Sequence, residues 1–304
     1  MGLTRKRVGW VLDLDIRDFF TSLDHGRVEE MLGHRIGDKR VLRLIQKWLR
    51  AGVVEEGVET ASEQGSPQGA TISPLLANVY LHYVLDIWAN AWRQEQARGE
   101  MIIVRYADDA VVGFQHRAEA ERFLVALIER CKEYGLELHP EKTRLLEFGR
   151  FAAENRKRRG EGKPETFDFL GFTHICGKTR KTGRFMVKRL PVSRRVRGKL
   201  QDIKAKLVKM MHTSIPSQGQ WLRSVIRGYY GYFAVPGTSY VITTFRTQVI
   251  RTWFWILRRR SQKTRINWER MNRYVDSWLP PARIQYPYPN QRFDARTQGR
   301  SPVR

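Results

Sequence analysis

The order of apolar and polar side chains predicts a strand near the start of the chain. From residue 8 to residue 16 the two kinds alternate, which is typical of a half-buried β-strand. Asp13 and Asp15 share the polar face of this strand, near its carboxyl end. Residues 26–50 then predict one or two helices, with a break at residue 37, where a glycine interrupts the pattern.

A second helical segment is predicted after a loop rich in Gly, Ser and Pro at residues 64–71. Ser73 and Pro74 suit a helix start, with serine as the N-cap and proline at the first helical position. The helix should continue to about residue 97. Apolar positions that recur at intervals of four predict one buried stripe along it, namely Leu75, Val79, Tyr83, Ile87 and Ala91.

Residues 101–114, MIIVRYADDAVVGF, predict a β-hairpin with Asp108 and Asp109 at or beside its turn. Residues 118–134 form an amphipathic pattern that Gly135 should end as a helix. A strand, a turn and another strand follow within residues 136–147. This order of elements favours an α+β fold with an antiparallel sheet and packed helices.

The rest of the chain changes character. Residues 149–166 have the composition of a flexible basic loop, and strand-like segments follow at 167–175 and 185–190. Helical patterns then occupy residues 193–212, 217–234, 238–262 and 267–278. We therefore predict an α+β domain over 1–190, an all-α domain over 191–279 and an extended or disordered basic tail over 280–304.

Charge is distributed unevenly between the two halves. The 304 residues carry 55 Lys and Arg against 31 Asp and Glu, a formal net charge of +24. Residues 1–149 contain 20 basic and 23 acidic side chains, whereas residues 150–304 contain 35 and 8. A surplus of this size predicts a polyanionic partner, and its position assigns that partner mainly to the second half.

Composition excludes several other classes of protein. A hydrophobic content of 41% with nine tryptophans indicates a globular protein rather than a disordered polycation. Cys131 and Cys176 are too few for a disulfide framework or a four-cysteine zinc module. No apolar run approaches the ~18 residues of a membrane span. We expect a cytoplasmic protein in a reducing compartment, without a membrane partner.

Three carboxylates are the candidate chemistry. The predicted sheet could bring Asp15, at a strand end, close to Asp108 and Asp109, at a hairpin tip. Packed acids repel one another unless cations neutralise them, and two Mg²⁺ ions held this way could carry out an in-line phosphoryl transfer. Two alternatives stay open at this point: paired aspartates also suit an ordinary turn, and Asp13 rivals Asp15 by periodicity.

A set of motifs, taken in order, resembles the palm of reverse transcriptases and, more narrowly, the group II intron reverse transcriptase/maturase family. YADD alone would be a weak signal, but the ordered set is specific. It consists of Asp15-Ile16-Arg17, Gly65-Ser66-Pro67-Gln68-Gly69, residues 72–78 (ISPLLAN), Tyr106-Ala107-Asp108-Asp109, Glu141-Lys142-Thr143 and Phe169-Leu170-Gly171-Phe172.

The resemblance implies a role for individual residues. It makes Asp15, Asp108 and Asp109 the catalytic carboxylates that bind two Mg²⁺ ions. It places Phe20, Gln68 and Lys142 around the incoming deoxynucleotide. It also identifies Phe169, Leu170 and Gly171 as part of the hairpin that holds the primer end. Without the family, these residues would be interpreted as core aromatics, turn residues and a solvated lysine.

The basic helical part corresponds to the family's thumb, also called the maturase or X domain. The implied partners are an intron RNA template, a DNA primer and dNTPs. Two clusters are the candidates for contact with RNA phosphates, because acids do not alternate with them: Arg156, Lys157, Arg158 and Arg159, and Arg258, Arg259 and Arg260.

The leading hypothesis is an RNA-directed DNA polymerase with a maturase role in intron splicing and mobility. The chain opens on the strand that carries Asp15, so the family's N-terminal fingers are expected to be missing. That expectation supports one alternative, an inactive truncated maturase that only binds RNA. Another alternative is a reverse transcriptase from a retron, a diversity-generating element or a CRISPR-linked system.

Overall fold

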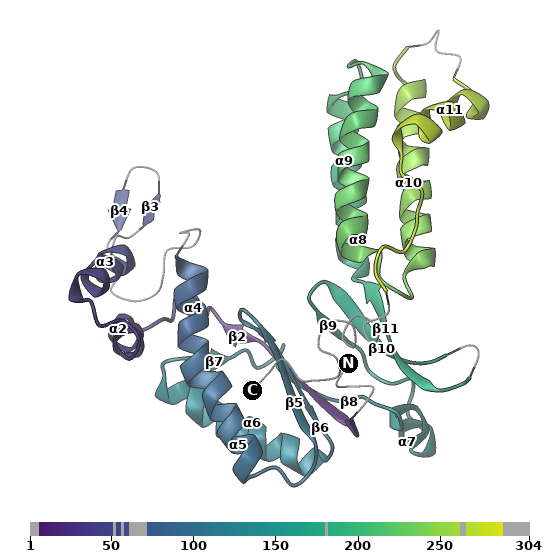
Figure 1. The fold of residues 1–304 in the computed structure, drawn as a ribbon. Helices are drawn as coiled ribbons and strands as arrows, with labels where there is room; N and C mark the ends of the chain where they lie inside the picture. The colour runs from purple at the N-terminus through teal and green to yellow at the C-terminus, as the bar shows by residue number, and fades with distance from the viewer. Residues whose placement is uncertain are drawn as a thin grey trace. The chain divides into compact units, whose positions relative to one another are not determined.

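A computed structural model describes residues 6–50, 53–55, 58–60, 72–179, 182–261 and 266–287 (Figure 1). The chain divides into two compact units. The first, called here the sheet unit, comprises Gly2–Thr166 and Cys176–Met186. The second, the helical unit, comprises mainly Phe167–Ile175 and Val187–Arg304. The division differs from the boundary expected at residue 190, because residues 167–175 group with the helices.

A four-stranded antiparallel sheet forms the centre of the sheet unit, in the order β5-β6-β1-β8. Its strands are β1 (Trp10–Leu14), β5 (Met101–Tyr106), β6 (Asp109–Phe114) and β8 (Arg144–Glu147). Strand β1 lies between β6 and β8, so that Leu12 is opposite both Val112 and Leu145. Val11 and Leu12 are both fully buried, and the middle of this strand is therefore covered on both faces rather than half-buried as expected.

The helices of the sheet unit begin and end close to the predicted positions. They include α2 (His25–Gly33), α3 (Lys39–Arg50) and α6 (Arg117–Glu133). Asp24 caps α2 by accepting a hydrogen bond from the amide of Arg27, and Gly135 follows α6 with a φ of 68°. A short ladder of β3 (Val53–Glu55) and β4 (Val58–Thr60) follows α3 and was not predicted.

The long helix predicted after residue 73 is present, but the prediction of its buried face was wrong. It consists of α4 (Ser73–Leu81), a π-helical segment η1 (His82–Ile87) and α5 (Trp88–Glu95). Ile72 occupies the N-cap position, and Ser73 is the first helical residue. Leu75 is 60% exposed and Ile87 48% exposed, so the expected stripe is not the buried one. A spacing of four drifts by about 40° at each step on an α-helix, and the π segment shifts the phase again.

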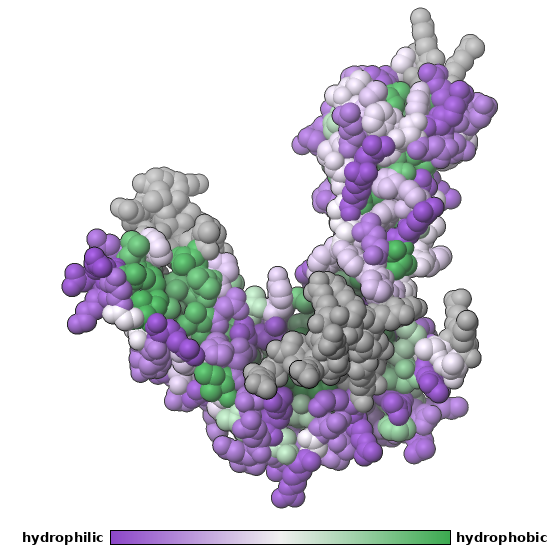
Figure 2. Space-filling view, viewed as in Figure 1, coloured by the Kyte–Doolittle hydropathy of each residue, from purple (hydrophilic) through white to green (hydrophobic). Residues whose placement is uncertain are grey.

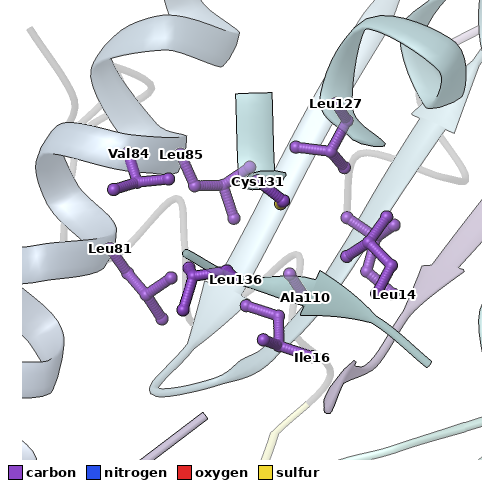
Figure 3. Close-up of a pocket in the computed structure, with 10 residues that line it drawn as sticks. Leu14, Ile16, Leu81, Val84, Leu85, Ala110, Leu127, Cys131 and Leu136 are labelled. Carbon is purple, nitrogen blue, oxygen red and sulfur yellow. The ribbon is translucent and has the colours of Figure 1, made fainter. Parts of the chain in front are cut away.

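The buried face of this helix packs with α6 on the sheet (Figure 1). Trp92, Phe114 and Phe123 form an aromatic cluster there, with ring centroids 5.1 to 6.3 Å apart. Next to it lies an apolar cavity of about 10 Å³, where side chains of α4, η1 and α6 point toward β1 and β6 (Figure 3). Cys131 lines this cavity, and burial raises the pKa of its thiol to about 12, which makes it an inert packing residue.

The stretch expected to be a flexible basic loop contains a helix, α7 (Ala152–Arg158), which corrects that prediction. Arg156 in this helix and Arg159 directly after it have acidic partners. Arg159 pairs with the buried carboxylate of Glu147 and with Glu161, while Arg156 lies 3.4 Å from Glu161. Composition alone could not indicate this helix, because the pairing carboxylates come from outside it.

The helical unit contains α8 (Ser193–Lys209), α9 (Ile215–Phe233), α10 (Ser239–Arg258) and α11 (Trp268–Trp278), all close to the predicted ranges (Figure 1). A buried glutamine joins three of its segments. Gln218 on α9 accepts a hydrogen bond from Trp253 Nε1 at 2.8 Å, and its amide nitrogen donates to the carbonyl of Met210 at 2.8 Å. The hydrogen bonds of this one buried side chain therefore connect α9, α10 and the end of α8 within the core.

Residues 280–287 of the expected tail are extended and bonded to the helices. The amide of Gln285 donates to Ala234, and the hydroxyl of Tyr286 donates to the carbonyl of Gly231. Arg246 on α10 donates to the carbonyl of Pro280. Of the two predicted alternatives, the extended one therefore holds for residues 280–287, and residues 288–304 lie outside the described ranges.

Two surface properties complete the fold. Val41, Leu44 and Trp48 are exposed on α3. Figure 2 shows hydrophobic residues, in green, at the surface in the region of this helix. Across the described residues, no helix combines the length and the apolar character that a membrane crossing requires.

Candidate active site

The backbone of Asp15 is held in place by residues 139–143, a segment far away in the sequence. It directly follows β1, and its carbonyl accepts hydrogen bonds from the amide of His139 at 2.8 Å and the hydroxyl of Thr143 at 3.3 Å. The amide of Asp15 lies 3.4 Å from the same hydroxyl oxygen. The pairing of β2 (Ile16–Arg17) with β7 (Glu137–Leu138) extends this attachment. The backbone that carries the first carboxylate is therefore fixed on both sides.

Asp108 lies in the two-residue turn between β5 and β6, where Tyr106 is opposite Asp109. The turn agrees with the prediction from the sequence. Its first residue, Ala107, has a φ of 54°, a left-handed conformation that is unfavourable for a residue with a β-carbon. Nη1 of Arg105 donates to the carbonyl of Ala107 at 2.8 Å.

Asp15 and Asp108 line one open pocket of about 400 Å³. Phe20, His139 and Lys142 line it too. Nζ of Lys142 lies 3.0 Å from Oδ2 of Asp15, so its ammonium group neutralises that carboxylate. The lysine side chain is 63% exposed, so neighbouring residues do not enclose it. The structure thus places two of the three predicted carboxylates and two of the predicted nucleotide-binding residues together.

Asp13, the rival of Asp15, lies elsewhere. It sits within β1, pairs with Arg144 at 3.5 Å and does not line the pocket. Asp109 is the first residue of β6, is exposed, and is not among the pocket-lining residues.

The donor set suits a hard divalent cation, because carboxylate oxygens are the ligands that Mg²⁺ prefers. The side chains are not gathered into a closed cage. Within the described ranges, no three His, Cys, Asp or Glu side chains come together as a metal site. Asp15 and Asp108, which face the same pocket, are the residues that could share an ion.

The two neighbouring phenylalanines have different environments. Phe19 is buried in the core and Phe20 is half-buried, and both residues line the pocket. Their ring centroids are 5.4 Å apart. Asp18, which also lines the pocket, has a φ of 44°, and its carbonyl accepts hydrogen bonds from the hydroxyls of Thr21 and Ser22. This tight loop precedes Phe20 and brings it to the same pocket as Asp15 and Asp108.

The predicted primer-end hairpin lies in the helical unit. Strands β9 (Phe167–Phe169) and β10 (Phe172–Lys178) are joined by Leu170 and Gly171, which both have positive φ. The carbonyl of Leu170 accepts a hydrogen bond from the hydroxyl of Tyr232 at 2.8 Å. The ring of Phe172 contacts those of Tyr232 and Phe233. These contacts with α9 explain why residues 167–175 group with the helices.

The other predicted residues have varied surroundings. Gln68 lies outside the described residues. In the first basic cluster Lys157 and Arg158 are exposed, whereas hydrogen bonds to Glu161 and Glu147 raise the pKa of Arg159. In the second, the guanidinium of Arg258 lies 5.1 Å from the ring of Trp255, and Arg260 donates to the carbonyl of His212.

Sequence reasoning did not single out His139 or the hydroxyl of Thr143, which position Asp15. Thr143 belongs to a quoted motif, so a role for it could have been inferred. His139 carries no spacing signal, and only the fold brings it to the pocket.

A family model described as "Reverse transcriptase (RNA-dependent DNA polymerase)" matches residues 3–174 of the chain, a range that includes Asp15 and Asp108. An antiparallel sheet that brings Asp15 to the YADD turn agrees with this match. The chain belongs to the reverse transcriptase family.

Its relatives include proteins of group II introns, which confirms the resemblance found in the motifs. Protein YkfC of Escherichia coli is 31% identical, over 47% of this chain and 44% of that protein. The group II intron-encoded protein LtrA of Lactococcus lactis is 38% identical, over 24% of this chain and 12% of its own length. The chain thus spans less than half the length of these curated relatives.

Solved structures with some likeness include telomerases of Candida. A telomerase of Candida albicans in complex with a fragment of telomeric RNA gives a TM-score of 0.44 at 13% identity, covering 90% of this chain and 49% of that one. An apo telomerase of Candida tropicalis gives 0.45 at 14% identity, covering 60% of this chain and 35% of that one.

Proposed function

We propose that this chain takes part in RNA-directed DNA synthesis of the group II intron type. The observation that carries the proposal is the shared pocket. Asp15 and Asp108 come from segments 93 residues apart in the numbering, and their carboxylates face one cavity together with Phe20 and Lys142. At about 400 Å³, this pocket has the size of a small-molecule site.

In the proposed reaction, the 3′-hydroxyl oxygen of a primer attacks the α-phosphorus of a dNTP. A bond forms between them, the bond from that phosphorus to the β-phosphate oxygen breaks, and pyrophosphate leaves while the hydroxyl proton passes to solvent. Asp15 and Asp108 would hold Mg²⁺, with Asp109 next to Asp108 in sequence. Two bound ions would lower the pKa of the hydroxyl and neutralise charge on the phosphates.

Other side chains of the pocket have supporting roles in the proposal. Lys142 neutralises Asp15 at 3.0 Å, and a triphosphate entering the pocket would offer its exposed ammonium group a stronger anionic partner. The ring of Phe20 would lie against the sugar and exclude a 2′-hydroxyl, which selects deoxynucleotides. Gln68 would contact the same nucleotide, and Phe169, Leu170 and Gly171 would hold the primer end.

The helical unit would supply RNA affinity and the maturase role in splicing. Trp255 is exposed beside Arg258 on α10, so an aromatic face for stacking and a cation for phosphate lie on one turn. The high positive charge of residues 150–304 supports binding to a nucleic-acid backbone, which in this proposal belongs to the intron RNA template. The cytoplasmic location stays a prediction.

Primer extension on an RNA template with dNTPs and Mg²⁺ tests the proposal. We expect extension by the wild-type chain and a loss of at least about 10³-fold in Asp108→Asn, since that change removes a metal-binding charge. Asp24→Asn is the matched control, because asparagine caps α2 as well as aspartate does. Extension that is undiminished in Asp108→Asn would contradict the assignment of this pocket.

RNA binding without extension defines the alternative. A wild-type chain that binds intron RNA in a salt-dependent way, yet incorporates no nucleotide under any metal condition, would act only as an RNA-binding protein.

A further inference from the structure

The YADD turn is attached to the neighbouring helix by three polar side chains that the family match assigns no role. They are Asn78 on α4, Asp86 on η1 and Arg105 on β5. The side chain of Arg105 is only 12% exposed. Its position one residue before Tyr106 brings the guanidinium group beneath the turn that carries Asp108.

Each of the three nitrogens of this guanidinium group donates to a defined acceptor. Nε donates to Oδ1 of Asp86 at 2.7 Å, and Nη2 donates to Oδ2 of the same carboxylate. Nη1 donates to Oδ1 of Asn78 at 2.9 Å and to the carbonyl of Ala107 at 2.8 Å. The amide of Asn78 is itself oriented by donation to the carbonyl of Pro74. The bidentate ion pair with Asp86, together with the two hydrogen bonds of Nη1, fixes the side chain of Arg105 in a single orientation.

The π-helical segment explains how Asp86 reaches this position. Within His82–Ile87 the helix has a wider turn, which shifts the phase of the side chains that follow. Ile87 is exposed there, while Asp86 faces β5 and lies 3.5 Å from Nδ1 of His82. π turns of this kind are frequent at functional sites.

The turn needs such support. Ala107 holds a φ of 54°, in the left-handed region that is unfavourable for a residue other than glycine. Two-residue hairpin turns prefer Gly or Asn for this reason, and alanine has no side chain that could stabilise the conformation locally. A hydrogen bond to the carbonyl of Ala107 supplies stabilisation from outside the turn.

The pair also controls charge. An arginine three residues from Asp108 would be attracted to that carboxylate and would compete with a divalent cation for it. The carboxylate of Asp86 neutralises Arg105 and holds it below the turn, so the carboxylate of Asp108 stays available to the pocket.

We propose that Asn78, Asp86 and Arg105 are positioning residues that hold the Ala107–Asp108 turn in its left-handed conformation and keep Asp108 directed into the pocket. The inference rests on the proposed polymerase function for its catalytic consequence. The attachment of the turn itself does not depend on that function.

Primer extension and hydrogen–deuterium exchange on the whole chain, measured on the same variants, test the proposal. Arg105→Gln should lower kcat by about 10- to 100-fold and change KM for dNTP less than about 3-fold, because the nucleotide contacts remain while the carboxylate is displaced. Exchange of the amides in residues 106–110 should increase. Asp86→Asn should change both measurements in the same direction, and it should also raise the Mg²⁺ concentration needed for half-maximal rate.

Ala107→Gly provides the rescue that a merely structural role would not show. Glycine adopts positive φ without steric cost, so Ala107→Gly should recover at least 3-fold of the kcat lost in Arg105→Gln. Arg117→Gln is the matched control, since Arg117 pairs with Glu121 on the exposed face of α6. It should leave kcat and the exchange of residues 106–110 unchanged.

The outcomes separate the two hypotheses. If the wild-type chain extends primers and Arg105→Gln equals it in kcat, or if Ala107→Gly gives no recovery, the positioning role is wrong. If the wild-type chain does not extend primers, the proposed function fails. Hydrogen–deuterium exchange alone then tests whether Arg105 holds the turn. Increased exchange at residues 106–110 in Arg105→Gln supports this role, and unchanged exchange overturns it.

Discussion

The sheet unit and the helical unit use buried polar groups for different purposes. In the sheet unit, the buried guanidinium of Arg105 supports a strained turn beside the pocket. In the helical unit, the buried amide of Gln218 joins Met210 and Trp253 within a core. Both side chains are fully engaged. The first arrangement orients a reactive group, whereas the second stabilises packing, so substitutions should affect rate in one unit and stability in the other.

The largest expected effect separates Asp15 from its rival. Asp15→Asn should lower kcat about 10³-fold, since a carboxylate of the pocket is lost, with little change in melting temperature. Asp13→Asn should stay within about 3-fold of wild type, because Asp13 pairs with Arg144 outside the pocket. Primer extension at saturating dNTP measures both. An equal loss of kcat in the two variants would show that Asp13 is also needed for catalysis.

A buried polar group gives the next effect, in the helical unit. Gln218→Leu leaves the indole N–H of Trp253 and the carbonyl of Met210 without this partner, which should cost about 2 to 3 kcal/mol of unfolding free energy. Urea unfolding followed by tryptophan fluorescence measures the loss. Gln220→Leu, on the exposed face of the same helix, should change the midpoint very little. A neutral result for Gln218→Leu would show that this hydrogen-bonded link contributes nothing net.

A close helix contact provides the third prediction. A β-carbon on Gly219 would lie 2.4 Å from Cγ of Trp278. Gly219→Ala should therefore displace α11 and destabilise the helical unit by about 2 kcal/mol. Gly228→Ala on the same helix meets nothing within 4 Å, so it should be neutral or slightly stabilising. Thermal unfolding of the two variants compares packing with helix propensity, and equal melting temperatures would contradict the contact.

The smallest effect depends on pH. Burial lowers the pKa of His174 from 6.5 to about 4, and its ring stacks on Phe167. The unfolded chain takes up this proton near pH 6.5, but the folded chain resists it until about pH 4. Stability from this residue is therefore complete above pH 6.5 and falls as pH decreases toward 4. Allowing for partial exposure, the loss from pH 7 to 4.5 is about 1 to 2 kcal/mol.

His174→Phe should remove this part of the pH dependence, which denaturant unfolding at several pH values measures. His212→Gln, at an exposed site, should keep the wild-type slope. A wild-type slope in His174→Phe would assign the pH dependence to other groups.

Prediction from the sequence succeeded where the pattern is local. All four helices of the helical unit occur near their predicted ranges, because a period of 3.6 residues is present in the pattern itself. It failed where a distant partner decides the outcome. Helix α7 forms in a stretch whose composition suggested a loop, and Arg159, directly after the helix, pairs with the distant carboxylate of Glu147. The stripe of α4 was misplaced because apolar residues lie on more than one face of that segment.

The candidate site shows the same limit. The family resemblance pointed to Asp15, Asp108, Phe20 and Lys142, which line one pocket, and to Asp109, which does not line it. Gln68, from the same prediction, lies outside the described residues. Periodicity could not choose between Asp13 and Asp15, because both fall on the same face of the predicted strand, whereas in the structure Asp13 lies within β1 and Asp15 follows it.

The sequence by itself determined the reverse transcriptase family, the helical second half and the uneven charge, because each is written in residue types and short spacings. Only the tertiary structure decided which carboxylates share a pocket and which residues support them. The register of β1 between β6 and β8 determines which carboxylates share the pocket. The phase of the π-helical segment against β5 determines which residues support them. Both depend on contacts between residues far apart in the chain, which no local pattern records.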